Sequence, residues 1–287
     1  ALWADLIYCW FVGHHSYLAS FFHKPLVVCI GGYDFANLPE YRYGNLTTWL
    51  GRRVARRVWK RADAIVAVAT SLALEAEYVM GLKLVLYVPT GHDHDFWTPG
   101  NGDRPYDVVS VMTADTPARA KLKGLDALYV LAYAMPNIGF HVAGTSILAA
   151  RTVPDIMTPL PWQPNNVTLH PWLSREDLRT LYQSSKVYLQ LSRREGMPSS
   201  LCEAMLCGCV PVATAVGDTQ HILADTGLVI FPGDIPWMVS KAKVAVREAL
   251  RMSQDGAGKD ARARIVKMFN LERRKLNLAA VLEDVVR

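Results

Sequence analysis

Short, almost continuously apolar runs alternate along the chain with longer segments in which apolar residues recur at helical spacing. In the first hundred residues the helical segments are Asn45–Arg61 and Ser71–Met80. The apolar runs predict four strands, at Asp5–Val12, Pro25–Gly31, Asp63–Ala69 and Leu84–Pro89. Strands that are apolar throughout, with helices between them, are typical of a parallel sheet covered on both faces. The pattern therefore predicts a doubly wound α/β domain.

A second series of the same kind follows a break rich in Pro, Gly and Asp at Thr98–Pro105. It predicts strands at Tyr106–Met112, Ile138–Ala143, Val167–His170, Val187–Leu191, Cys209–Ala213 and Leu228–Phe231. It predicts helices at Gly124–Met135, Ser174–Ser184, Ser199–Leu206, Thr219–Ala224, Ile235–Arg251 and Leu271–Val286. We therefore expect one α/β domain at 1–98, a second at 99–270, and a final helix at 271–287 that packs back on the first. The first domain shows about four strands where such units have about six, so it is predicted to be incomplete.

Composition narrows the class of protein. Hydrophobic residues make up 51% of the 287 residues and charged residues 20%, which suits two folded cores and excludes a disordered chain. No apolar run approaches the roughly 18 residues of a membrane-spanning helix. The five cysteines lie in or beside apolar stretches and lack the spacing of a zinc site, so we expect buried free thiols and a reducing, cytoplasmic location.

One stretch of the second series combines a strand end, a turn, a helix start and two carboxylates. It is Ser192–Met205, with the sequence SRREGMPSSLCEAM. Backbone N–H groups at a helix start are unpaired and carry the positive end of the helix dipole, so they suit a phosphate or the hydroxyls of a sugar. Ligands of open α/β sheets bind at the carboxyl ends of the strands, where this turn is expected. Glu195 and Glu203 either bind different hydroxyl groups of one elongated ligand or are ordinary acids near a helix start. The residues alone favour neither interpretation.

Spaced elements around this stretch resemble the C-terminal domain of retaining glycosyltransferases of family 4, the group 1 glycosyl transferases. Seven residues separate Glu195 from Glu203, and Gly208, Pro211, Gly217, Gly227 and Pro232-Gly233-Asp234 follow in the family's order. Upstream, Lys123-Gly124-Leu125-Asp126 precedes a helix and Phe140–Gly144 ends a strand. The resemblance covers residues 106–286 well and residues 1–99 weakly. It implies an α/β protein with the GT-B fold, in which two Rossmann-like doubly wound domains face a cleft.

The resemblance also implies an activity. The expected enzyme is a retaining, metal-independent hexosyl- or related glycosyltransferase of glycan biosynthesis. It would move a sugar from a nucleotide-sugar donor, such as a UDP- or GDP-sugar, to a glycan, lipid-linked or small-molecule acceptor. No cofactor or metal is expected beyond the donor. A sugar-nucleotide epimerase with the same fold is an alternative.

The family's pattern assigns roles residue by residue. Glu203 would hold the ribose hydroxyls of the nucleotide, and Glu195 would contact the donor sugar. Lys123 and Arg119 would neutralise the diphosphate, whose negative charge grows as it leaves. The other donor-side candidates are Gly196, Met197, Pro198, Ser199 and Ser200 after Glu195, with Gly144, Trp172 and Leu173 at neighbouring strand ends.

The N-terminal half departs from the family's pattern. No glycine-rich loop follows the first strand, and Gly31-Gly32-Tyr33-Asp34 stands where the family often has a histidine that faces the reacting carbon. Asp34 is a candidate for positioning the acceptor hydroxyl, with a turn or cap role as its alternative. His14 and His15 are further acceptor-side candidates. These departures keep a second function open, namely a non-catalytic nucleotide- or sugar-binding fragment or an inactive truncated homologue.

Basic residues crowd the predicted helix Asn45–Arg61, although the net charge of the whole chain is only +5. They interleave with an apolar stripe of Leu50, Val54, Val58 and Trp59. One interpretation is a surface helix whose stripe packs on the core. A second is peripheral contact with anionic lipid headgroups at the inner face of the membrane. The third, nucleic acid, is not expected as a partner, because no recognised nucleic-acid motif accompanies the charge.

Overall fold

The computed structural model describes residues 3–81, 83–146 and 163–287. The chain forms two compact units. The first comprises Ala1–Gly91, Glu195–Met197 and Leu271–Arg287, and the second comprises His92–Arg194 and Pro198–Asn270.

The boundary between the units falls after Gly91, not after Thr98 as composition suggests. The segment after Gly91 is held by the second unit, because the backbone N–H of His92 donates to the carbonyl oxygen of Phe269 at 2.8 Å. The guanidinium of Arg262 also donates to the carbonyl oxygens of His94 and Trp97. The Pro- and Gly-rich break therefore lies inside the second unit.

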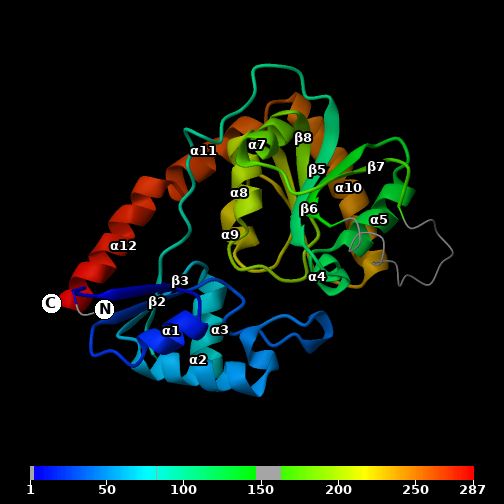
Figure 1. Cartoon of the computed structure of the whole chain (residues 1–287). Helices are drawn as coiled ribbons and strands as arrows, with labels where there is room; N and C mark the ends of the chain where they lie inside the picture. Colours follow the sequence, from blue (N-terminus) through cyan, green and yellow to red (C-terminus); the bar gives the residue numbers. More distant parts are fainter. Residues whose placement is uncertain (1–2, 82, 147–162) are drawn as a thin grey trace. The chain divides into compact units, whose positions relative to one another are not determined.

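The first unit contains a four-stranded parallel sheet (Figure 1). Its strands are β1 (Ile7–Trp10), β2 (Leu26–Ile30), β3 (Ala64–Ala67) and β4 (Val85–Tyr87), in the order β1-β2-β3-β4. Every residue of the central strands β2 and β3 is buried. All four strands were predicted, each two to four residues longer than observed.

The helices of the first unit follow the predicted pattern with two differences. They are α1 (His14–Ala19), α2 (Trp49–Arg61), α3 (Thr70–Met80) and α12 (Leu271–Val286), with 3-10 turns at Pro39–Tyr41 and Asn45–Thr47. The predicted helix from Asn45 is split because Thr48 caps α2, its side chain accepting from the backbone N–H of Gly51. The short helix α1 was not predicted, since six residues carry too little periodicity.

The second unit contains a six-stranded parallel sheet. Its strands are β5 (Tyr106–Ala114), β6 (Phe140–Thr145), β7 (Val167–His170), β8 (Ser185–Gln190), β9 (Val210–Thr214) and β10 (Leu228–Ile230). Their order is β10-β9-β8-β5-β6-β7, so the chain starts in the middle, runs to one edge and then returns to the other side of β5. All six strands of this series were predicted, and β7 has the predicted bounds.

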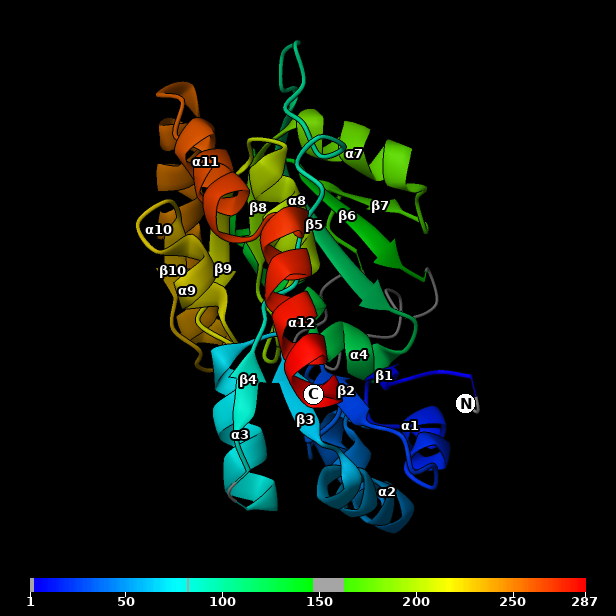
Figure 2. The same ribbon diagram turned by 90° about the vertical axis from the view of Figure 1, so that its left-hand side faces the viewer.

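Helices cover both faces of this sheet (Figures 1 and 2). On one face, α5 (Leu125–Ala134) packs against α10 (Ile235–Gln254); on the other lie α7 (Arg175–Gln183), α8 (Ser199–Leu206), α9 (Thr219–Leu223) and α11 (Gly258–Met268). The apolar side chains of α5, such as Leu125 and Leu128, are almost fully buried against the sheet. Among the described helices of this unit, α11 and the short α4 (Pro117–Leu122) were not predicted, because glycine, proline or short length masks their periodicity.

Two further predictions concern buried groups and membrane crossing. All five cysteines are buried and free, as expected from their apolar neighbours. Among the described parts of the chain, none of the helices combines the length and apolarity needed to cross a membrane.

Candidate functional site

The order of strands in the second unit defines where a ligand can bind. Strands β5 and β8 are hydrogen-bonded neighbours, and the connections that leave them run to opposite sides of the sheet. In an open α/β sheet such a reversal leaves a crevice at the carboxyl ends of the two strands. The segments that follow β5 and β8 are those that contain Lys123 and Ser192–Ser200. The topology thus brings together two motifs that are remote from each other in the sequence.

A partly buried ion pair joins these two segments. Arg193 binds Asp126 through two hydrogen bonds, from Nη1 to Oδ1 at 2.8 Å and from Nη2 to Oδ2 at 2.9 Å. The side chain of Asp126 is only 7% exposed. The backbone N–H of Arg193 also donates to the carbonyl oxygen of Leu122 at 2.8 Å. Because a bidentate guanidinium-carboxylate pair fixes both distance and plane, it sets the turn after β8 against the turn that contains Lys123.

Gly124 allows these two turns to approach each other. Its φ is +81°, and a Cβ atom at this position would lie 2.1 Å from the carbonyl oxygen of Leu191. Only glycine fits, both because of its backbone conformation and because of the close backbone contact. Gly124 and Asp126 therefore have structural roles in the motif Lys123–Asp126, beside the charge of its lysine. The sequence alone did not predict these roles or that of Arg193.

The helix α8 begins directly after the turn. Its N-cap is Pro198, which makes no side-chain cap hydrogen bond, so the first-turn N–H groups are not capped by that residue. Ser199 is exposed, and the hydroxyl of Ser200 lies 2.8 Å from the hydroxyl of Tyr188 on β8. At the start of the turn, the hydroxyl of Thr214 donates to the carbonyl oxygen of Ser192 at 2.6 Å. The strand ends thus hold both sides of the turn in place.

Glu203 is half-buried on the second turn of α8. Burial raises the pKa of its carboxyl group from an ordinary value of 4.5 to about 7, and the positive charge of Arg175 on α7 acts in the opposite direction. A carboxylate with this pKa changes its charge near neutral pH. It is also a group that gains from hydrogen-bond donors, such as ribose hydroxyls, because they favour its ionised form.

The two predicted cations lie on α4 and at its end. Lys123 is the C-cap of α4, and its backbone N–H donates to the carbonyl oxygen of Arg119. The guanidinium of Arg119 lies 3.8 Å from the carboxylate of Asp115, on the exposed surface. Of the two, Lys123 is the one whose backbone is fixed directly next to the Gly124 contact with the end of β8.

The other donor-side candidates lie at the ends of β6 and β7. Gly144 has φ +83°, and a Cβ atom there would approach the carbonyl oxygen of Met112 on β5 to 2.7 Å. Trp172 is 74% exposed and Leu173 is half-buried, in the segment after β7. This segment begins next to a histidine pair, since Nδ1 of His141 and Nε2 of His170 are 2.9 Å apart. Burial lowers the pKa of both imidazoles, and sequence reasoning had not singled out this pair.

The remaining candidates belong to the first unit. Asp34 is 1% exposed, and its carboxylate accepts from the backbone N–H groups of Val12, Gly31 (2.7 Å) and Gly32 (3.3 Å). These bonds engage both carboxylate oxygens and join the segments that follow β1 and β2. Burial raises the pKa of this carboxyl group, while the backbone N–H groups act to lower it.

Glu195, Gly196 and Met197 group with the first unit, whereas Pro198 and the following residues belong to the second. A Cβ atom at Gly196 would lie 2.6 Å from the carbonyl oxygen of Gly31, so the two glycines make a close backbone contact. The Sδ atom of Met197 lies 3.0 Å from the backbone nitrogen of Thr90. Among residues 3–81, 83–146 and 163–287, the structure shows no cluster of three or more His, Cys, Asp or Glu side chains that could hold a metal ion.

Comparison with known proteins agrees with this architecture. Residues 163–254 match the family model of the glycosyl transferases group 1. A curated relative, the D-inositol 3-phosphate glycosyltransferase of Mycolicibacterium smegmatis, is 29% identical over 181 residues, which are 59% of this chain and 42% of the relative. The chain therefore spans about two fifths of the length of that relative.

Two solved structures show the same fold. Sucrose-phosphate synthase from Thermosynechococcus elongatus superposes with a TM-score of 0.77 and 16% identity, over 98% of this chain and 73% of that one. Anabaena HepE, solved in complex with UDP and glucose, superposes with a TM-score of 0.78 and 19% identity, over 97% of this chain and 77% of that one. The chain has the GT-B fold, and its resemblance to the group 1 glycosyl transferases, inferred from sequence, is confirmed over residues 163–254.

Proposed function

We propose that this chain is a retaining, metal-independent glycosyltransferase that takes its sugar from a nucleotide-sugar donor, such as a UDP- or GDP-sugar, held by the second unit. The acceptor is a glycan, a lipid-linked sugar or a small molecule, held by the first unit. The proposal is supported by the family match over residues 163–254, by the relative that is a glycosyltransferase, and by the neighbour solved with UDP and glucose.

The observation that carries the proposal is the partly buried pair between Arg193 and Asp126. It joins the turn before α8 to the turn with Lys123, at the reversal point of the sheet. In this proposal the positive helix terminus and the lysine lie on either side of one crevice. Such an arrangement suits a diphosphate, which carries several negative charges and gains another as the glycosidic bond breaks.

In this proposal each group acts on a different part of the donor. Glu203 accepts hydrogen bonds from the ribose hydroxyls, which favour its ionised form. Backbone N–H groups of the turn bind phosphate and sugar; they come from Gly196, Met197, Ser199 and Ser200, because Pro198 in the same turn has no N–H. The nucleotide is bordered by Gly144, Trp172 and Leu173.

Lys123, with Arg119 in a lesser role, stabilises the departing diphosphate. Fixed cations aimed at developing charge lower the barrier without reorganisation at the moment of reaction. Glu195 contacts the donor sugar. We assign Asp34 a positioning role for the segments after β1 and β2, because backbone N–H groups already engage both of its oxygens.

Isothermal titration calorimetry with UDP and GDP tests donor binding. We expect one nucleotide to bind, and we expect Glu203→Gln to weaken binding by about tenfold or more, as loss of a charge-assisted hydrogen bond does. Glu248→Gln is the matched control, since Glu248 lies on α10 in an exposed pair with Arg251. Binding that is equal in the Glu203 and Glu248 variants would overturn the assigned site.

Activity and mechanism need separate measurements. Release of sugar or its transfer to an acceptor, followed by NMR of the anomeric proton, tests both the transferase activity and the retaining stereochemistry, and activity in the presence of a chelator tests metal independence. Nucleotide binding without any turnover of the donor would instead support a non-catalytic nucleotide-sugar-binding chain. Donor turnover that yields an isomeric sugar nucleotide without an acceptor would indicate an epimerase.

A further inference from the structure

Helix α2 carries a concentration of positive charge that the proposed function does not use. Its 13 residues, WLGRRVARRVWKR, contain six basic side chains and no acidic one. A surface helix of ordinary composition mixes both signs of charge, because opposite charges three or four positions apart stabilise it. This helix instead accumulates like charges, which repel one another unless a partner neutralises them.

The basic residues lie on the face of α2 that points away from the core. The buried residues Val54, Ala55, Val58 and Trp59 form one stripe of the helix. At about 100° per residue, Arg53, Arg56 and Lys60 lie on the opposite side. The stripe predicted from sequence is confirmed for Val54, Val58 and Trp59, but Leu50 is 56% exposed and lies outside it.

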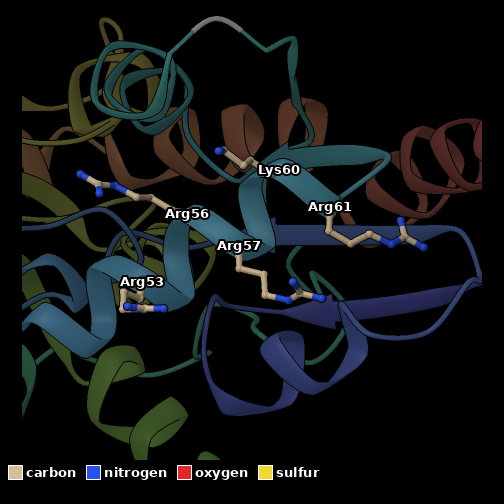
Figure 3. A pocket seen from close by; sticks show the side chains of 5 residues that line it. All are labelled: Arg53, Arg56, Arg57, Lys60 and Arg61. Atoms are coloured by element: carbon tan, nitrogen blue, oxygen red, sulfur yellow. The ribbon is translucent and has the colours of Figure 1, made fainter.

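Two hollows on the surface are lined by these cations. The first, of about 520 Å³, is formed by Arg53, Arg56, Arg57, Lys60 and Arg61, whose side chains extend from successive turns of α2 (Figure 3). The second, of about 600 Å³, is bordered by Arg56 and Lys60 together with Lys83. Arg56 and Lys60 therefore line both hollows, so the positively charged surface is continuous across α2.

Part of this charge is already used within the unit. Arg61 pairs with Asp63 at 2.8 Å, and Arg57 donates to the hydroxyl of Ser20 at 3.0 Å. Within the described residues, Arg53, Arg56 and Lys60 form no ion pair with an acidic side chain. These three cations are available to an external anion.

Large apolar side chains surround the cations. Trp49 and Leu50, on the first turn of α2, are 69% and 56% exposed. From α1 and the turn after it, Leu18 is 63% exposed and Phe21 is 54% exposed, and the guanidinium of Arg57 stacks on the ring of Phe21 at 3.9 Å. Helices α1 and α2 pack against each other, and we call the surface formed by these exposed side chains and the cations of α2 the α1–α2 face.

We propose that the α1–α2 face docks on a membrane surface that contains anionic lipids. The cations bind headgroup phosphates. Trp49, Leu50 and Phe21 enter the interfacial layer of the membrane, where apolar side chains are removed from water while the neighbouring cations stay hydrated. A polynucleotide would also neutralise the charge, but it would leave the exposed aliphatic Leu18 and Leu50 in water. The combination of available cations with aliphatic and aromatic side chains thus favours lipid.

The proposal is tested by co-sedimentation of the whole chain with vesicles. We expect binding to phosphatidylcholine vesicles that contain phosphatidylglycerol and little binding to phosphatidylcholine alone. The triple variant Arg53→Gln, Arg56→Gln, Lys60→Gln should weaken binding to the anionic vesicles by about a hundredfold at low salt. The matched control, Lys241→Gln, Lys243→Gln, Arg247→Gln, removes the same charge from α10 and should bind like the unaltered chain.

A second variant separates insertion from simple charge attraction. Trp49→Ala should weaken vesicle binding severalfold, and this loss should persist in high salt, which screens charges but does not weaken apolar burial. Equal binding to both kinds of vesicle, an undiminished triple variant, or tighter binding to single-stranded RNA than to anionic vesicles would each overturn the proposal. Nucleotide titration of the same variants should be unchanged, so failure here is distinguishable from failure of the proposed function.

Discussion

At the scale of single residues, the candidate acids Asp34 and Glu203 lie in different environments. Asp34 is buried, and backbone N–H groups engage its carboxylate on both oxygens. Glu203 is half-buried, with Arg175 as a positive charge that favours its ionised form. Burial alone raises a carboxyl pKa, and hydrogen bonds to the ionised form lower it. We therefore expect Glu203 to be the acid whose charge responds to a ligand.

The raised pKa of Glu203 predicts how stability depends on pH. The folded pKa of about 7 exceeds the ordinary 4.5, so the contribution of this group to stability is fully present below about pH 4.5 and is lost as the pH rises through 7. Glu203→Gln, which cannot ionise, should stabilise the ligand-free protein by about 2 to 3 kcal/mol above about pH 8 and have little effect near pH 4.5. Urea unfolding at a series of pH values measures this difference. A constant difference at all pH values would show that Glu203 does not titrate in this range.

At the scale of elements, the site depends on how two connections meet, and not only on the ends of single strands. Residues 115–124 follow β5, and residues 191–198 follow β8. Gly124 lets their backbones touch, and the pair between Arg193 and Asp126 fixes them there. The motif around Lys123 therefore positions a turn as well as supplying a charge.

Replacing Gly124 with alanine should show how tightly the two turns are packed. The new Cβ would have to displace the backbone of Leu191 and would also strain a residue with positive φ. Gly256 is the matched control, since its φ is +83° and a Cβ atom there would meet no other atom within 4 Å. We expect Gly124→Ala to lose about 2 kcal/mol more stability in urea unfolding than Gly256→Ala, and to weaken nucleotide binding as well. Equal losses would mean that the contact with Leu191 relaxes freely.

At the scale of the whole molecule, each unit is stabilised by segments that are remote in sequence. The first unit includes α12, from the end of the chain. Arg274 on α12 donates to the carbonyl oxygens of Val88 (2.9 Å) and Pro89 (2.7 Å). The same guanidinium lies 5.0 Å from the centre of the Trp10 ring. One side chain thus connects α12 to the segment after β4 and to the end of β1.

Removal of this side chain should loosen the first unit selectively. Arg274→Ala should increase hydrogen-deuterium exchange in peptides from β1 and β4, because the carbonyl oxygens of Val88 and Pro89 lose a charged donor. Exchange in β5 and β8 of the second unit should stay the same. Lys275→Ala is the control, since Lys275 is exposed and pairs only weakly with Glu272 at 3.7 Å. Equal exchange in the two variants would show that α12 does not stabilise the sheet through Arg274.

The sequence alone determined the parts of this protein that depend on local interactions. All ten described strands were predicted, and α8 and α12 have their predicted bounds, because hydrophobic periodicity and turn residues act over a few positions. The family resemblance, including Glu195 and Glu203, also comes from local spacing. Short helices such as α1 and α4 were not predicted, because so few residues show no clear helical period.

Only the tertiary structure decided which of these parts meet. The order β10-β9-β8-β5-β6-β7 places residues after β5 next to residues after β8, and no local pattern contains that order. The pairing of Arg193 with Asp126, the assignment of residues 92–98 to the second unit, and the packing of α1 beside α2 are likewise long-range. Their physical basis is the burial of side chains that are distant along the chain, which depends on the complete set of packed elements and not on any one of them.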